Sequence, residues 1–89
     1  MKCIISVLGK DRTGVVAAIS TVLEECGANI EDISQTILKE IFSMTMVVTL
    51  NLDVMSFNEV QERLVKTGED VGMQVVLQRQ DLFESMHKI

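Results

Sequence analysis

The chain has 89 residues, of which 47% are hydrophobic, and its 13 carboxylates against 8 Lys and Arg residues give a net charge of −5. This apolar fraction excludes a disordered chain, and the length fits one small domain, residues 1–89, with a thin stability margin that a partner would widen. The acidic balance and the absence of Trp and Tyr argue against a nucleic-acid-binding protein, which needs a basic face and bases to stack on.

The N-terminal segment lacks the pattern of a leader or a membrane anchor. Its apolar run, within residues 1–9, is short and is followed at once by three charged residues. The two cysteines, Cys3 and Cys26, have neither the number of a disulfide framework nor the spacing of a CxxC site. We therefore expect a cytoplasmic protein with reduced thiols and no membrane segment.

The first third of the chain predicts a strand, a loop and a helix. Residues 2–8 are apolar at nearly every position, which is typical of a central strand. A loop with a glycine at each end covers residues 9–14. From Val15 to Cys26 the apolar positions then recur at helical spacing, and Gly27 stands where a left-handed residue ends a helix.

The middle of the chain predicts two strands. Residues 30–39 mix apolar and polar positions, as an edge strand does, whereas residues 42–52 alternate strictly between apolar and polar over eleven positions. That alternation predicts a long strand with one face in the core. Because only Glu40 and Ile41 separate the two segments, we expect them to form a hairpin.

The last third predicts a helix, a strand and a second, shorter helix. Ser56 and Glu59 have the spacing of a capping box, which opens a helix that ends at Gly72. Gly68 lies inside this helix and is expected to loosen its last turn. Residues 73–80 return to strand alternation, and residues 81–89 have the pattern of a short C-terminal helix.

The element order is therefore β-α-β-β-α-β followed by a short helix. This order, with right-handed crossovers, gives an α+β, ferredoxin-like sandwich in which the first and third strands are central and the second and fourth form the edges. The hydrophobicity agrees, because residues 2–8 and 42–52 are the apolar pair of strands. The core is expected over about residues 2–80.

The residues available for catalysis or metal binding are few. His87 is the single histidine, so no Ser/His/Asp or Cys/His arrangement can be built in the body of the fold. Met44 and Met46 alternate as core residues do. Cys3 and Cys26 could approach each other, although two buried core thiols is the interpretation we favour. We expect no enzyme, no metal and no cofactor.

The loop of residues 9–14 is the first candidate binding site. It leads from the end of a central strand into a helix, whose free N–H groups and positive end suit a small anion such as an amino-acid carboxylate. Lys10 and Arg12 add positive charge. The alternative is a plain turn in which Thr13 caps the helix, and the residues alone favour that alternative slightly.

Asn29 is the second candidate, since its amide can both donate and accept hydrogen bonds, although asparagine in such a loop is commonly a turn former. Two segments then point to a family: G-K-D-R-T-G-V-V at residues 9–16 and G-A-N-I at residues 27–30. Within a βαββαβ order they resemble the ACT domain, a regulatory module that senses amino acids. The chain is similar to the ACT modules of glycine-cleavage regulators and to small bacterial proteins made of one ACT domain.

The resemblance implies which residues contact an amino-acid ligand. The family's ligand loop falls on Asp11, Arg12, Thr13 and Gly14, and the residue that contacts a bound amino acid at the start of the second strand falls on Asn29. Thr13 replaces the proline of many ACT domains. Because ACT domains usually pair with the ligand between protomers, the resemblance implies a homodimer, which the half-polar edge strands support.

Three functions follow from these observations. The first is a regulatory module that binds an amino acid or a similar metabolite as a homodimer and reports to a protein partner. The second is a ligand-free dimerisation or adaptor protein, because a sensor of this length must report to something. The third is a small acylphosphatase-like enzyme, which the spacing of the loop and the lack of an arginine in the first helical turn disfavour.

Overall fold

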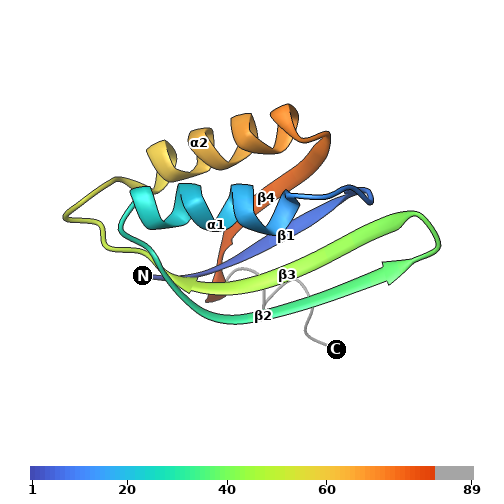
Figure 1. Cartoon of the computed structure of the whole chain (residues 1–89). Coiled ribbons are helices and arrows are strands. Elements are labelled where there is room, and N and C mark those ends of the chain that lie inside the picture. The colour runs from blue at the N-terminus through green and yellow to red at the C-terminus, as the bar shows by residue number, and fades with distance from the viewer. Residues whose placement is uncertain (82–89) are drawn as a thin grey trace.

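The structure, a computed structural model, describes residues 1–81. Six elements follow one another: β1 (Lys2–Lys10), α1 (Val15–Glu25), β2 (Asn29–Leu38), β3 (Ile41–Thr49), α2 (Phe57–Asp70) and β4 (Met73–Arg79). The strands form one antiparallel sheet in the order β2-β3-β1-β4, and both helices cover one of its faces (Figure 1). The predicted ferredoxin-like βαββαβ fold, with β1 and β3 central, is confirmed. Apart from Asp81, the helix expected over residues 81–89 lies outside the described residues.

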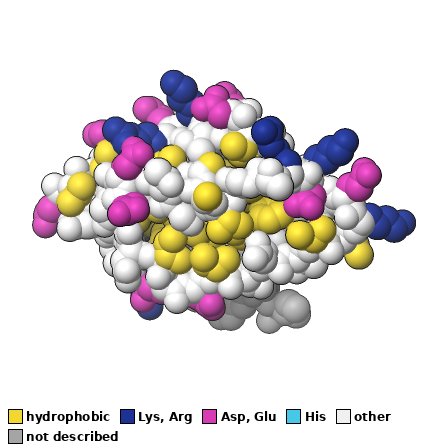
Figure 2. All heavy atoms as spheres, viewed as in Figure 1, with side chains coloured by type: hydrophobic (Ala, Val, Ile, Leu, Met, Phe, Trp, Pro, Cys, Tyr) yellow, Lys and Arg dark blue, Asp and Glu magenta, His cyan; other side chains and the backbone are white. Residues whose placement is uncertain are grey.

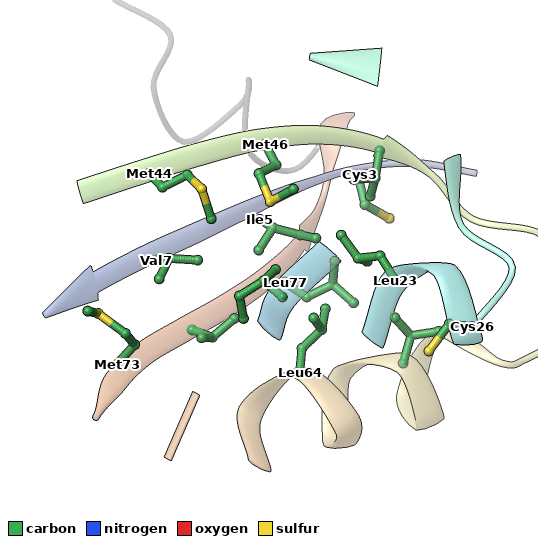
Figure 3. Close-up of a cluster of buried hydrophobic side chains, with 14 of the residues drawn as sticks. Cys3, Ile5, Val7, Leu23, Cys26, Met44, Met46, Leu64, Met73 and Leu77 are labelled. Atoms are coloured by element: carbon green, nitrogen blue, oxygen red, sulfur yellow. The ribbon is translucent and has the colours of Figure 1, made fainter. Parts of the chain in front are cut away.

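The core lies between the sheet and the helices. Strand alternation directs Ile5 of β1 and Met46 of β3 toward the helices, where Leu23 of α1 and Leu64 of α2 meet them, each fully buried (Figure 3). Among residues 1–81 no polar or charged side chain is buried. Any binding chemistry in this part of the chain is therefore at the surface.

Strand β3 ends earlier than the alternating pattern predicts. The ladder with β1 stops where Lys2 faces Thr49, although Leu50 is still held by Met1, whose carbonyl accepts from the Leu50 N–H at 2.8 Å. The side chain of Asn51 then accepts from the N–H of Asp53 at 3.0 Å and turns the chain. The apolar–polar alternation continues beyond Thr49, but β1, the strand that pairs with β3 there, begins at Lys2 and extends no further.

Helix α2 begins at the predicted capping box and packs tightly on β4. The Ser56 Oγ accepts from the Glu59 N–H at 3.3 Å. Gly68 is buried, and a Cβ there would lie 2.5 Å from Val75 Cγ2 and 2.8 Å from the Met73 carbonyl oxygen. Gly68 therefore allows a close helix–strand approach, a different role from the loosened turn expected from the sequence.

The loops gather at the two ends of the sheet. The β1–α1 loop, the β2–β3 turn and the α2–β4 turn share one end, whereas the N-terminus, the α1–β2 connection and the β3–α2 loop lie at the other (Figure 1). No helix within residues 1–81 is long and apolar enough to cross a membrane.

Candidate functional site

The β1–α1 loop is fixed at both of its glycines, for different reasons. At Gly9 a Cβ would lie 2.6 Å from Met73 Sδ and 2.9 Å from the Gly72 carbonyl oxygen, so only glycine lets β1 and β4 approach there. Gly14 has open space around it but a φ of +86°, a conformation that L side chains rarely adopt. The loop is thus shaped by packing at its start and by backbone conformation at its end.

The loop is also tied to the β2–β3 turn. The Asp11 N–H donates to the Glu40 carbonyl at 2.7 Å. This bond links the start of the candidate ligand loop to the far end of β2. Residue type gives no sign of this role of Glu40, because the contact is made by a backbone carbonyl.

Helix α1 begins without a side-chain cap. Its N-cap residue is Gly14, whose carbonyl accepts from the Ala18 N–H at 2.9 Å, and no side-chain oxygen bonds to the first turn. The alternative in which Thr13 caps the helix is therefore wrong, because the left-handed Gly14 takes the N-cap position. The N–H groups of the first turn have no intrahelical partner, and their positive end faces the loop.

Charged side chains precede this helix in the loop. Lys10, Asp11 and Arg12 are all exposed, and together with Val71 and Gly72 of the α2–β4 turn they line an open pocket. The fold topology could have indicated that the α2–β4 turn contributes to this pocket, because that turn leads into β4, the neighbour of β1 in the sheet. The loop offers two cations, one carboxylate and free backbone donors, which suits a small ligand that carries both charges.

Asn29 is far from this loop within one protomer. It is the first residue of β2, lies opposite Thr49 and is exposed. Helix α1, with eleven residues, separates it from Gly14 by about 16 Å along the helix axis. The structure therefore places Asp11 and Arg12 at this pocket, with Thr13 and Gly14 next in the same loop, and leaves Asn29 at the opposite end of the molecule (Figure 1).

The segment after Asn29 carries negative charge. A bulge lies between Ile30 and Asp32. Glu31 accepts from the Thr49 hydroxyl at 2.6 Å and lies 3.7 Å from the Lys2 ammonium, and Asp32 accepts from the Ile33 N–H at 2.9 Å. The start of β2 is thus acidic and ordered by its own side chains.

The two thiols are free, buried and separate (Figure 3). Cys3 belongs to β1 and Cys26 follows α1. Burial away from water raises the pKa of both thiols above its usual value, and the nearby Arg63 opposes this effect at Cys26. Neutral core thiols, as expected, fit this setting.

The described part of the chain offers no metal site. Within residues 1–81 no group of three His, Cys, Asp or Glu side chains lies close enough to hold an ion. His87, the single histidine, lies outside the described residues.

The fold and the loop together define a ferredoxin-like domain with a glycine loop ahead of its first helix. The chain belongs to the ACT domain family, whose model matches residues 2–78. It is 47% identical to a UPF0237 protein of Methanocaldococcus jannaschii, over 99% of this chain and 98% of that protein. These matches confirm the predicted family, and membership in it favours a regulatory ligand-binding role.

Solved structures agree on the fold. An ACT domain protein from Streptococcus pneumoniae is 38% identical, with a TM-score of 0.81 and 94% of each chain covered. A putative glycine cleavage system transcriptional repressor has a TM-score of 0.78 at 19% identity, with 89% of this chain and 45% of that one covered. The second likeness concerns the fold alone.

Proposed function

We propose that residues 1–89 form one regulatory domain, without enzymatic activity, which binds an amino acid as a homodimer and reports its presence to a protein partner in the cytoplasm. The observation that carries this proposal is the uncapped start of α1 behind the loop of residues 11–14. Membership in the ACT domain family favours ligand binding. The N-terminal end of α1 supplies unpaired N–H donors at a surface with charges of both signs.

The ligand chemistry follows from these groups. A carboxylate accepts from the first-turn N–H groups of α1 and lies near the positive charge of Arg12, whereas the Asp11 carboxylate attracts an α-ammonium group. The amide of Asn29 bonds to either end of such a ligand. Because Asn29 lies about one helix length from Gly14 in the same protomer, it joins the site from the second copy.

Antiparallel pairing of two β2 strands achieves this. The start of one β2 then lies beside the end of the other, and that end adjoins Glu40, whose carbonyl holds Asp11. Asn29 thus approaches the partner's loop, and a two-fold axis creates two equal sites.

A screen of the common amino acids by thermal unfolding tests the proposal. A ligand present at a hundred times its dissociation constant stabilises the protein by about 2.7 kcal/mol. Asn29→Ala should weaken that response, whereas Asn58→Ala, an exposed asparagine of α2, should leave it unchanged. If every amino acid leaves the melting temperature of a confirmed dimer unchanged, binding of the common amino acids is excluded and the adaptor function is favoured.

A further inference from the structure

The open face of the sheet, opposite the helices, is unevenly exposed. Both helices of residues 1–81 pack on the other face (Figure 1). On β1, Ile4 points to the open face and is nevertheless only 6% exposed, whereas Leu8, four residues further along the same face, is 49% exposed. One end of the open face is therefore covered, and the other is not.

The neighbouring strands show the same difference between the two ends. Ile4 lies opposite Val47 of β3 and Gln78 of β4, and both of these residues are half-buried. Ser43 and Gln74, which pair with β1 nearer its other end, are exposed. Ile4 is buried but does not belong to the hydrophobic core between the sheet and the helices. Its burial therefore requires a cover on the open face itself.

Strand β4 leads the chain to this end of the sheet. Its ladder with β1 ends at Arg79, one residue after the position opposite Ile4. The chain then turns, because Gln80 and Asp81 are helical and the Asp81 carboxylate accepts from the Arg79 guanidinium at 2.9 Å. The next segment of the chain, residues 82–89, therefore follows directly beside the covered end of the open face.

We propose that residues 82–89 of the same chain form this cover, as a short amphipathic helix that lies across the open face over Ile4 and Val47. Helical spacing places four apolar residues of the segment on one side: Leu82, Phe83, Met86 and Ile89. Glu84 and Lys88 take the opposite side, toward the solvent. Eight helical residues are about 12 Å long, and neighbouring strands are about 4.8 Å apart, so the segment crosses from β4 over β1 to β3. This cover does not depend on the proposed function.

A second apolar surface is the alternative for this segment. Figure 2 shows hydrophobic side chains gathered between α1 and the β2–β3 hairpin, on the helix side of the sheet. There Ile33 and Ile37 of β2 are 40% and 55% exposed, whereas Ile4 is buried. β2 and β4 are opposite edges of the sheet, so β2 lies about 14 Å from the strand that residues 82–89 follow. The open face is both the nearer surface and the one whose side chains are covered.

Nuclear magnetic resonance of the full chain tests the cover directly. The chain contains three phenylalanines, and two of them, Phe42 and Phe57, pack in the core on the helix side of the sheet. A nuclear Overhauser effect between an aromatic ring and the methyl groups of Ile4 therefore identifies Phe83. We expect this contact, together with one to the methyl groups of Val47, in the unmodified protein.

Each other result overturns the proposal. Contacts from Phe83 to Ile33 or Ile37 would place the segment on the helix side of the sheet. In a mixture of isotope-labelled and unlabelled chains, a contact found only between chains would show that a second copy supplies the cover. A Phe83 ring in contact with none of these residues would show that the segment does not cover Ile4.

Phe83→Ala gives a second readout in urea unfolding. Because the variant removes a buried aromatic side chain, it should raise the equilibrium constant of unfolding at least about tenfold. Glu84→Ala, on the solvent side of the same segment, is the matched control and should change that constant by less than about threefold. Equal effects of the two substitutions would contradict the burial of Phe83 and with it the proposed cover.

Discussion

At the scale of single residues, the loop of residues 9–14 contains residues whose structural roles cannot be distinguished from the sequence motif. Its two glycines look equivalent in the sequence, yet Gly9 admits a neighbouring strand and Gly14 supplies a left-handed backbone. The role expected of Thr13 in capping was wrong because the N-cap position falls one residue later, on Gly14. A sequence shows which residue types are present at a helix start, but the backbone conformation decides which of them caps it.

The two buried thiols predict a pH dependence of stability. Burial raises their pKa, so the folded protein holds protons that the unfolded chain releases. Their contribution to stability is complete below the unfolded pKa of about 8.5–9 and is lost as the pH rises through the folded pKa. Urea unfolding should therefore show a free energy of unfolding that falls above about pH 9.

The control for the thiols is a variant with both Cys3→Ala and Cys26→Ala. It should be less stable at pH 7 but should lose less stability between pH 8 and about pH 10 than the parent chain. An equal decline in both proteins would show that other groups cause the pH dependence.

At the scale of elements, local patterns predicted every helix and strand of residues 1–81. The two helices and the third strand have a strong hydrophobic period, whereas the first strand is a continuous apolar run and the second is mixed. Their ends were less predictable where they depend on a partner strand. β3 was expected to reach residue 52 and stops at Thr49, where β1 has no further residue to pair with. The bulge near Glu31 likewise reflects pairing between strands.

The contact between α2 and β4 gives a prediction that opposes helix propensity. Gly68→Ala should stabilise an isolated helix by about 1 kcal/mol. In this fold its Cβ would meet the Met73 carbonyl and Val75, so we expect the variant to lose about 1–3 kcal/mol of stability in urea unfolding. Lys66→Ala, exposed on the same helix, is the matched control and should change stability by less than about 0.5 kcal/mol. A Gly68→Ala variant more stable than the parent would refute this close packing.

At the scale of the whole molecule, the fold followed from the order of the elements, whereas the site did not. Asp11 and Asn29 were two separate candidates, which the resemblance to a family joined only through a ligand held between protomers, and α1 holds them at opposite ends of the protomer. The antiparallel pairing of two β2 strands that we propose would resolve this separation, since it would bring Asn29 of one copy to the partner's loop. The proposed dimer would also add stability to a small domain with a thin margin, through the surface buried between two copies.

Complementation between two inactive variants tests most directly whether the ligand site is shared between protomers. Gly14→Asp damages the loop, and Asn29→Ala removes the amide, so neither variant alone should bind the amino acid found by the screen with parental affinity. In a mixed dimer one site contains both damaged residues and the other contains neither.

After equal amounts are unfolded together and refolded, half of the dimers should be mixed, so titration calorimetry should find about one quarter of the parental number of sites, with parental affinity. The same experiment with Asn58→Ala in place of Asn29→Ala should give more sites, because the Asn58→Ala chain keeps both the loop and the Asn29 amide intact. No binding in the Gly14→Asp and Asn29→Ala mixture, although mixed dimers are present by mass spectrometry, would contradict a site shared between two copies.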